Sequence, residues 1–357
     1  MSEARSRKSR VFLIAVLLLL VVLLCGLLWI YQSLSTSPER AVVEADVAGV
    51  EFEFGAYAYT NSEGVQTNMV TPVGVAYDGD NRIYATMPTE DTVVVFDADG
   101  SNGRVFVQDD SSVPRDTLSE FKVVRPLGID VDDNGDVYIA CEPKAAVVVF
   151  DEDGTKLREI PAMAPRYLCV KNGLVYVLSK GTLHIYDRQG TEVGRWGTFG
   201  RGLDQLSYPV GVTVTDDGTI LIADTNNYRV VALSPDLEPV WIFGRAATTQ
   251  EAQNRRILAS PVGIALDSDG TAFVIDMLNC SIRVFDVNGN MIGEPLGEKG
   301  SLDNQFYNPS TLDHMEEDLF VIADQANNRL LGVRLNAVGD AVMTPGESVE
   351  GTTTIGE

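Results

Sequence analysis

Short runs of apolar and β-branched residues alternate with polar turns along most of the chain, from about residue 50 to residue 335. Typical runs are VGVTV at residues 210–214, TILIA at residues 219–223 and VVVF at residues 93–96, and Asp, Asn and Gly dominate the turns between such runs. Runs of roughly four to eight residues between turn signals predict β-strands. No stretch beyond residue 40 has the spacing of an amphipathic helix, so the pattern predicts an all-β domain.

These strands belong to a repeat that opens with the phrase Pro-any-Gly. Six copies, 39 to 54 residues apart, begin at the following prolines, and the third and sixth copies lack the glycine: Pro72, Pro126, Pro165, Pro209, Pro261 and Pro309. Each copy holds about four predicted strands, and a four-stranded propeller blade needs about 40 to 50 residues. First strands are predicted to begin at residues 73, 127, 166, 210, 262 and 310. The repeat therefore predicts a six-bladed β-propeller over residues 49–335.

The last copy ends near Leu335, after its third strand. At the other end of the domain, the segment EFEFG at residues 51–55 has the alternation of a strand and the aromatic-Gly ending of the other fourth strands. We expect this segment to supply the outer strand of the final blade, because such a join removes the open edges of an unclosed array of sheets.

Turns rich in Asp connect the first and second strands, as in Asp216-Asp217-Gly218. They allow a calcium-site interpretation or a hairpin interpretation. An EF-hand needs oxygen ligands at alternating positions and a Glu at the twelfth, and these turns lack that pattern. Asp, Asn and Gly close tight hairpins because they tolerate positive φ or bind their own backbone. We therefore interpret these residues as hairpin turns.

Copies 4 and 6 share a longer phrase, IADTNNYRV at residues 222–230 and IADQANNRL at residues 322–330. With the Pro-any-Gly opening and the aromatic-Gly ending, this phrase resembles the signature of the NHL repeat, whose members fold as β-propellers. The resemblance weakens in other copies, where Ser281, for example, stands in place of the signature Arg. The resemblance implies that Asp224 and Arg229 fix the loop between the second and third strands, which is a structural role.

The N-terminal segment predicts the compartment. Residues 11–31, VFLIAVLLLLVVLLCGLLWIY, are 21 residues without a charge, and a helix of that length spans the roughly 30 Å of a bilayer core. The basic residues 1–10 keep the N-terminus cytoplasmic and place the rest of the chain outside. A cleaved signal peptide is the competing interpretation, but its apolar core is shorter, and Pro38 disfavours cleavage at the preceding small residues. We predict an uncleaved transmembrane anchor in the cell membrane, a linker at residues 32–48 and a flexible tail at residues 336–357.

Composition excludes several classes of function. The net charge of −24 repels phosphate backbones, so we expect no nucleic-acid binding. The relatives of NHL-type propellers include a zinc-dependent amidating lyase, whose zinc site needs several histidines. This chain has only two, His184 and His314, which are too few for such a site. The sequence contains no Gly-x-Ser-x-Gly elbow and no Cys-x-x-Cys pair, so neither a nucleophilic triad nor a redox dithiol is indicated.

One position of the inner strands faces the propeller axis. In the six copies it is occupied by Ala76, Asp130, Cys169, Thr213, Ala265 and Asp313. The architecture also resembles lactonase-like propellers, which hold a central divalent metal with acidic and amide side chains. Asp130 and Asp313 are therefore candidate ligands of a divalent cation such as calcium, which prefers several converging oxygens. The alternative is that both carboxylates face a hydrated channel.

The connections between copies are candidate binding loops, because a rigid scaffold presents its loops for function. From Gly to Pro, the connections into copies 4 and 6 are both 12 residues long, whereas the connection into copy 5 is 17 residues long. Arg and Tyr are favoured anchors of interfaces. The candidates on the long connections and on the degenerate third copy are Arg115, Arg166, Tyr167, Arg245, Arg255 and Arg256.

Together these features predict a membrane-anchored, extracytoplasmic propeller that serves as a non-catalytic scaffold or sensor. Its expected partner is another envelope protein or an extracytoplasmic, anionic ligand, and no cofactor is required. The alternative is a divalent-metal-dependent, lactonase-like hydrolase that uses the axial carboxylates.

Overall fold

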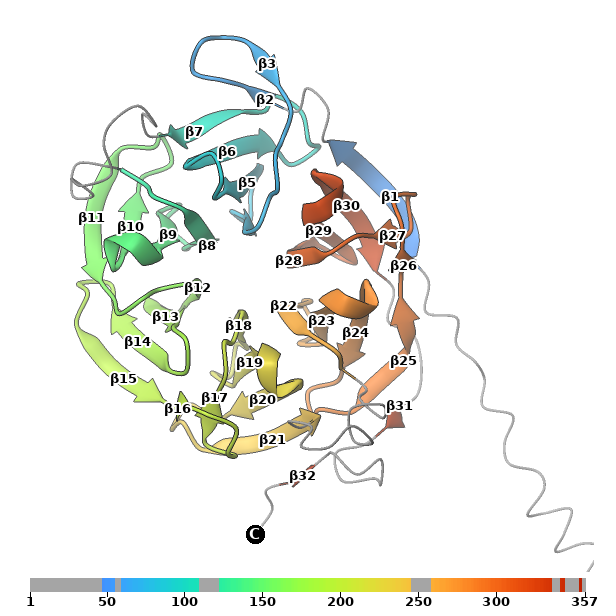
Figure 1. Ribbon diagram of the computed structural model, residues 1–357. Coiled ribbons are helices and arrows are strands. Elements are labelled where there is room, and N and C mark those ends of the chain that lie inside the picture. Colours follow the sequence, from blue (N-terminus) through green and yellow to red (C-terminus); the bar gives the residue numbers. More distant parts are fainter. Residues whose placement is uncertain are drawn as a thin grey trace, which may run out of the picture. The chain divides into compact units, whose positions relative to one another are not determined.

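The computed structural model describes residues 47–54, 59–108, 122–244 and 258–335, together with two short strands at residues 341–343 and 353–354. In this part of the chain, six antiparallel sheets stand around a central axis as the blades of a propeller (Figure 1). Each blade has four principal strands, the first at the axis and the fourth at the rim. The predicted all-β, six-bladed architecture is confirmed.

The principal strands of each blade, from the axis to the rim, have the following bounds. Blade 1 contains β4 (Val75–Tyr77), β5 (Arg82–Met87), β6 (Thr92–Asp97) and β7 (Arg104–Gln108). Blade 2 contains β8 (Pro126–Val131), β9 (Val137–Cys141), β10 (Ala146–Phe150) and β11 (Lys156–Pro161). Blade 3 contains β12 (Tyr167–Lys171), β13 (Leu174–Leu178), β14 (Leu183–Asp187) and β15 (Glu192–Trp196). Blade 4 contains β18 (Gly211–Val214), β19 (Ile220–Asp224), β20 (Arg229–Leu233) and β21 (Pro239–Gly244). Blade 5 contains β22 (Pro261–Leu266), β23 (Ala272–Asp276), β24 (Ser281–Phe285) and β25 (Met291–Leu296). Blade 6 contains β28 (Pro309–Glu316), β29 (Leu319–Asp324), β30 (Arg329–Leu335) and β1 (Val47–Phe54).

Shorter elements lie at the edges of the blades. The pair β2 (Tyr59–Thr60) and β3 (Gln66–Thr67) extends blade 1 beyond β7. Two parallel pairs form in the connections between blades: β16 (Thr198–Phe199) with β17 (Gln205–Leu206), and β26 (Glu298–Lys299) with β27 (Gln305–Phe306). In the predicted tail, β31 (Ala341–Met343) pairs with β25, and β32 (Thr353–Thr354) pairs with β21.

Blade 6 joins the two ends of the domain. Strand β1 pairs antiparallel with β30, from Val47 opposite Leu335 to Phe54 opposite Leu330. The segment around residues 51–55 therefore supplies the outer strand of the last blade, as the sequence predicted. This pairing closes the ring, because the third strand of blade 6 would otherwise be left as an open edge.

The glycines of the Pro-any-Gly phrase are required by close approach between blades. A Cβ atom on Gly211 would lie 2.1 Å from the carbonyl oxygen of Val262, and one on Gly128 would lie 2.6 Å from the Cα of Tyr167. In both cases the inner strand of one blade meets the inner strand of the next. In the four copies that have it, the glycine thus permits the first strand to lie close to the first strand of the next blade.

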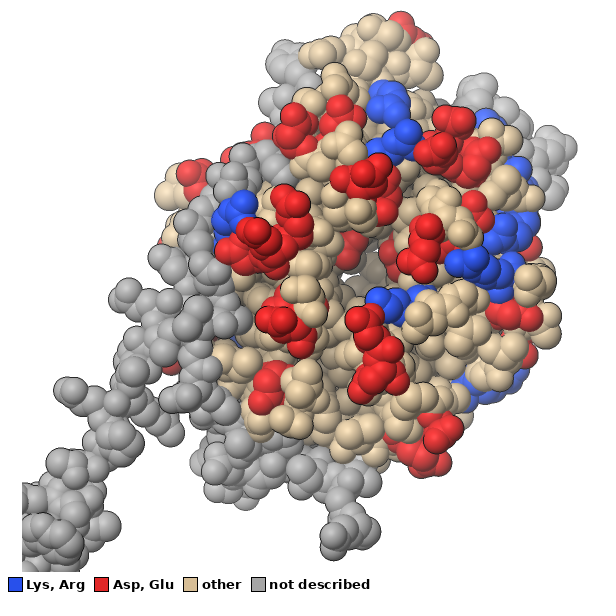
Figure 2. All heavy atoms as spheres, turned by 180° about the vertical axis from the view of Figure 1, so that it is seen from behind, with Lys and Arg blue, Asp and Glu red and all other residues tan. Residues whose placement is uncertain are grey.

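The ring has two chemically different faces. The loop face carries the connections from each rim strand to the next inner strand, and the 3-10 turns η2 (Glu142–Lys144), η3 (Thr225–Asn227), η4 (Met277–Asn279) and η5 (Gln325–Asn327). The opposite turn face carries the tight hairpins between first and second strands and between third and fourth strands. Figure 2, which is seen from behind the view of Figure 1, shows Asp and Glu side chains gathered on that side around the central opening.

The Asp residues that open these hairpins bind their own turns. Asp78 Oδ1 accepts N–H groups from Asp80, Asn81 and Arg82. Asp132, Asp151, Asp267 and Asp286 each accept two such N–H groups in the equivalent turns. Since these carboxylates close hairpins, the hairpin interpretation of the Asp-rich turns is confirmed.

The N-terminal predictions fall mostly outside the described residues. These are the basic segment 1–10, the transmembrane segment 11–31 and nearly all of the linker 32–48. In the part of the chain that the structure describes, no helix has the length and apolarity needed to cross a membrane.

Candidate functional site: the axial channel and the loop face

A cavity of about 630 Å³ runs along the axis and is lined by residues of all six inner strands. At the loop face it is bordered by backbone of the Pro-any-Gly phrases, including Gly74 and Gly211. At the turn face it is bordered by hairpin residues, among them Asp217 and Asp269. Asp130 and Asp313 lie on the wall between these ends. The axial position that the sequence predicted for these two carboxylates is therefore correct.

Each axial carboxylate connects its own blade to the following blade. Asp130 Oδ2 accepts the N–H of Val170, on β12 of blade 3, at 2.6 Å. Asp313 Oδ2 accepts the N–H of Tyr77, on β4 of blade 1, at 2.7 Å. The other carboxylate oxygen of each residue accepts the N–H of the next residue in its own strand. Both carboxylates are thus held in fixed orientations by backbone donors from two blades.

The channel wall raises the pKa of its acidic groups. Burial raises the pKa of Asp130 to about 6. Burial and the negative charge of Asp130 raise the pKa of Asp313 to about 8. Burial also raises the pKa of the Cys169 thiol, and the charges of Asp130 and Asp313 add to that effect. The three groups therefore disfavour further negative charge on the axis.

A cation at the axis would find few ligands. The free lone pairs of Asp130 and Asp313 are hard oxygen donors of the type that Ca²⁺ uses. Within the described ranges, no group of three His, Cys, Asp or Glu side chains is arranged to hold a metal ion. A divalent ion here would therefore depend on these two carboxylates, on backbone or hydroxyl oxygens and on water.

On the loop face, the signature residues of blade 4 form a buried clamp. Arg229 Nε donates to Asp224 Oδ2 at 2.8 Å, and both side chains are buried. Asn227 Nδ2 donates to the same carboxylate at 2.7 Å and to the carbonyl oxygen of Gly200 at 2.9 Å. Arg229 also donates to the carbonyl oxygen of Gln205. Gly200 and Gln205 belong to the connection from blade 3, so the clamp holds that connection against blade 4.

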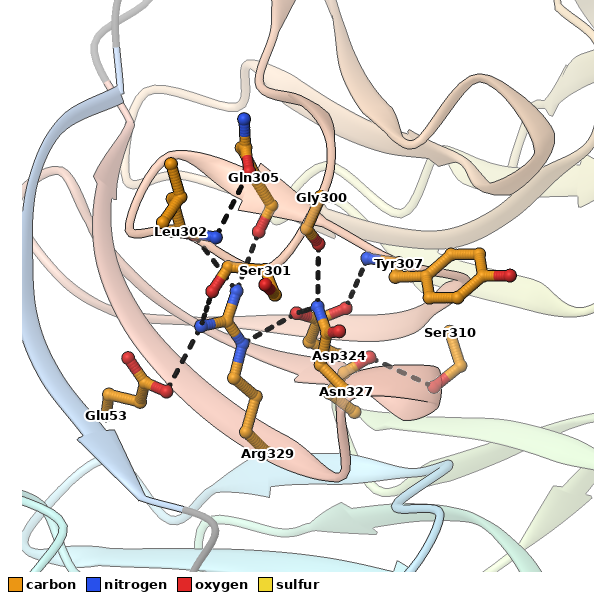
Figure 3. A network of polar contacts seen from close by, with 11 residues as sticks. Glu53, Gly300, Ser301, Leu302, Gln305, Tyr307, Ser310, Asp324, Asn327 and Arg329 are labelled. Atoms are coloured by element: carbon orange, nitrogen blue, oxygen red, sulfur yellow. Dashed lines mark hydrogen bonds and ion pairs between the residues drawn. The ribbon is translucent and has the colours of Figure 1, made fainter.

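Blade 6 repeats this clamp almost atom for atom (Figure 3). Arg329 Nε donates to Asp324 Oδ2 at 2.8 Å, and Asn327 Nδ2 donates to that carboxylate at 2.7 Å and to the carbonyl oxygen of Gly300 at 2.8 Å. The remaining guanidinium nitrogens donate to the carboxylate of Glu53 on β1 and to the carbonyl oxygens of Ser301, Leu302 and Gln305. The clamp therefore joins the incoming connection, the last blade and the closing strand.

These contacts extend the role that the resemblance implied. The signature Asp and Arg bracket the turn between second and third strands, as expected, but the guanidinium reaches across to the connection that precedes the blade. A signal for this was present in the sequence. The two copies with the complete signature are the two that follow a 12-residue connection.

Blade 3 lacks this clamp and has a different network at the same place. Ser179 follows β13, where Asp224 ends β19 in blade 4, and its Oγ lies 3.4 Å from His184 Nε2. His184 Nδ1 lies 2.9 Å from Glu192 Oε1 on β15. Ser179 and His184 are buried, and Ser179 Oγ also donates to the carbonyl oxygen of Thr182. This network ties a short turn to its blade, so His184 is a packed strand residue, as the sequence indicated.

The structure describes two of the six predicted partner-binding residues. Arg166 lies on the loop face and pairs with Glu142 of η2 at 3.4 Å. Tyr167 lines the channel mouth, and burial raises the pKa of its phenol. Arg166 and Tyr167 are adjacent in the sequence, but their side chains lie in different environments. Four candidates lie outside the described residues: Arg115, Arg245, Arg255 and Arg256.

Comparisons with known proteins agree with this architecture. A model of the NHL repeat matches residues 206–233, which include the first three strands of blade 4. The chain is 30% identical over 224 residues to NHL repeat-containing protein 3 of Homo sapiens, a match that covers 56% of this chain and 61% of that protein. It is 31% identical over 86 residues to Protein SUPPRESSOR OF QUENCHING 1, chloroplastic, of Arabidopsis thaliana, with 23% of this chain and 8% of that protein covered. The chain thus matches less than two thirds of the length of either relative.

A solved structure supports the fold alone. A streptogramin B lyase superimposes with a TM-score of 0.55 at 13% identity, and the match covers 80% of this chain and 97% of that chain. The matched repeat lies on a blade that carries the complete Asp, Asn and Arg clamp, and the same blade plan recurs around the ring. The chain is therefore a six-bladed β-propeller that contains an NHL repeat in blade 4.

Proposed function

We propose that this protein is a membrane-anchored, extracytoplasmic scaffold or sensor that binds a partner and does not turn over a substrate. The observation that carries the proposal is the use of the axial carboxylates. Asp130 and Asp313 each bind a backbone N–H of the following blade, at 2.6 and 2.7 Å. Because both carboxylates already join neighbouring blades, they support a structural role for the channel. Binding is then expected at the connections on the loop face.

The proposed location rests on the uncharged segment 11–31 and the basic residues before it. A positively charged flank retained in the cytoplasm places the propeller on the other side of the membrane. The proposed partner is another envelope protein or an anionic ligand. The arginines of the two long connections support this choice, because Arg is favoured at interfaces and binds carboxylate or phosphate with two hydrogen bonds.

The experiment is purification of the full-length protein from its native membrane after mild crosslinking, followed by mass spectrometry of the bound proteins. One partner at near-equal amount, lost after charge reversal at Arg255 and Arg256, is the expected result. The control is charge reversal at Arg195, an exposed rim residue that pairs with Glu192. Binding that survives the reversal at Arg255 and Arg256 would remove these arginines from the site.

A second candidate is a divalent-metal-dependent, lactonase-like hydrolase. The observation that favours it is the convergence of two carboxylates on a cavity of about 630 Å³. Burial and the negative charge of Asp130 raise the pKa of Asp313, and a bound cation would favour its ionised form. In this candidate Asp130 and Asp313 hold the ion, and ester or lactone substrates enter the channel.

Metal analysis of the purified protein tests this candidate. Stoichiometric calcium or another divalent ion in the wild type, lost in the Asp130→Ala, Asp313→Ala double variant, would favour the hydrolase. Equal metal content in the wild type and the double variant would eliminate the axial site.

A further inference from the structure

The two clamps hold two exposed apolar surfaces in place. The connection at residues 198–208 enters blade 4, and the connection at residues 298–308 enters blade 6. We call these segments the clamped connections. Within each, a parallel strand pair fixes the backbone, and the clamp binds its carbonyl oxygens. Large apolar side chains nevertheless remain exposed on them: Phe199 at 61%, Leu203 at 53%, Tyr208 at 37%, Leu302 at 65% and Tyr307 at 46%.

Contacts within each clamped connection also hold it in place, in addition to the contacts with the clamp. Gln205 Oε1 accepts the N–H groups of Arg201 and Gly202, and Gln305 Oε1 accepts the N–H of Leu302. Their side chains are also ordered against one another. The rings of Phe199 and Tyr208 meet edge to face at 5.7 Å, and the ammonium group of Lys299 lies 4.9 Å from the centre of the Tyr307 ring. An apolar surface that is ordered before binding loses less conformational entropy when a partner covers it.

The clamped connections differ from the rest of the protein in their net charge. The two segments contain only Arg201 and Lys299 as basic residues, against Asp204, Glu298 and Asp303. They therefore carry almost none of the net charge of −24. A cluster of roughly four to eight basic residues marks a surface for anionic lipid, and these segments lack one. Depletion of net charge with exposed aromatic and aliphatic residues is typical of the centre of a protein–protein interface.

The exposed area fits the core of such an interface. An aromatic side chain has about 150–250 Å² of surface, so five large side chains that are about half exposed present on the order of 400 Å². A standard interface buries about 800 Å² on each partner. The two clamped connections flank blade 5, so together they would supply about half of one side of an interface with a partner that reaches across the loop face of that blade.

We propose that the clamped connections form a docking surface for a protein partner that presents an apolar patch, with Leu203 and Leu302 as central contacts. The signature residues Asp324 and Arg329, and their equivalents in blade 4, act as positioning residues that keep this surface in its binding conformation. The inference rests on the proposed binding function and assigns that function to a defined part of the loop face.

The test is site-specific photocrosslinking in the full-length protein, in its native membrane. The photoreactive residue p-benzoylphenylalanine replaces Leu203 or Leu302, or, as a matched control, Val287. Val287 has the same exposure as Leu302, 63% against 65%, but lies on the turn face. We expect the same protein adduct from positions 203 and 302 and none from position 287. The adduct at position 203 should fall at least tenfold when Leu302→Asp is added, with the unfolding midpoint unchanged.

Three outcomes would overturn the inference, and they separate it from the proposed function. A partner that still co-purifies but crosslinks from neither clamped connection removes this docking surface and leaves the scaffold role intact. Adducts to lipid alone would replace the protein partner by a membrane surface. The absence of any adduct or co-purifying partner would overturn both proposals.

Discussion

Removal of the guanidinium group of Arg329 tests whether the clamp of blade 6 stabilises the whole ring. In Arg329→Met the side chain keeps an unbranched aliphatic stem, and the buried ion pair with Asp324 is lost. Asp324 is 0% exposed and Arg329 3% exposed, so water does not replace the missing partner. Removal of one partner of a buried pair costs about 3–5 kcal/mol. We expect the free energy of unfolding to fall by about that amount.

Part of the clamp remains in the variant, which sets the lower end of this range. Asp324 still accepts N–H groups from Asn327 and from the backbone of Tyr307. The carbonyl oxygens of Leu302 and Gln305 lose their charged donor. Arg329→Lys retains the charge but not the planar fork that reaches several acceptors at once. Its free energy of unfolding should therefore lie between that of the wild type and that of Arg329→Met.

Urea unfolding followed by tryptophan fluorescence measures the effect, and Arg195→Met is the control. Arg195 pairs with Glu192 at 2.6 Å, with the two side chains 67% and 27% exposed, so its loss costs less than about 1 kcal/mol. Hydrogen exchange of residues 298–308 should accelerate in Arg329→Met and not in Arg195→Met. A loss of stability as small as that of Arg195→Met, with unchanged exchange, would refute a stabilising clamp.

Three further changes have defined outcomes. The folded pKa of Asp313 is raised to about 8, so its contribution to stability is full below about pH 4 and is lost as the pH rises through 8. Asp313→Asn should make the free energy of unfolding less dependent on pH between about pH 4 and pH 9, and an unchanged pH dependence would contradict this. Gly211→Ala places a Cβ atom 2.1 Å from the carbonyl oxygen of Val262 and should cost about 1–3 kcal/mol, whereas Gly194→Ala, with no contact under 3.4 Å, should cost less by thermal unfolding. Deletion of residues 47–54 removes the outer strand of blade 6 and should yield aggregating or protease-sensitive protein; a monomeric, protease-resistant product would show that β1 is dispensable.

The fold could be predicted because its signals are local and repeated. A tight hairpin needs Asp or Gly at particular positions, and close approach of inner strands needs glycine, as at Gly211. These requirements recur in each copy, so the repeat appears in the sequence. The closing strand was predictable for a related reason, since an open third strand in blade 6 demands a partner and the segment at residues 51–55 has the pattern of one.

The contacts between blades were harder to predict. The residues next to Asp130 in the sequence do not indicate that its carboxylate accepts the N–H of Val170, 40 residues away. The reach of Arg329 to Gln305 depends on how the incoming connection folds over the blade. Tyr167, a predicted anchor of the loop face, also lines the channel. Such contacts are set by the relative placement of blades, which the pattern within one repeat does not encode.

The two faces of the ring carry different amounts of information about function. Much of the acidity of the turn face follows from hairpin chemistry repeated in blades 1 to 5, because residues such as Asp78 and Asp267 bind the N–H groups of their own turns. An acidic face is thus expected of this fold whatever its partner. No such requirement explains Leu302, whose backbone is clamped while its side chain remains 65% exposed. A single exposed leucine is ordinary, but five large apolar side chains are exposed on the two clamped connections, and this grouping is better evidence for a binding surface than the more conspicuous charge.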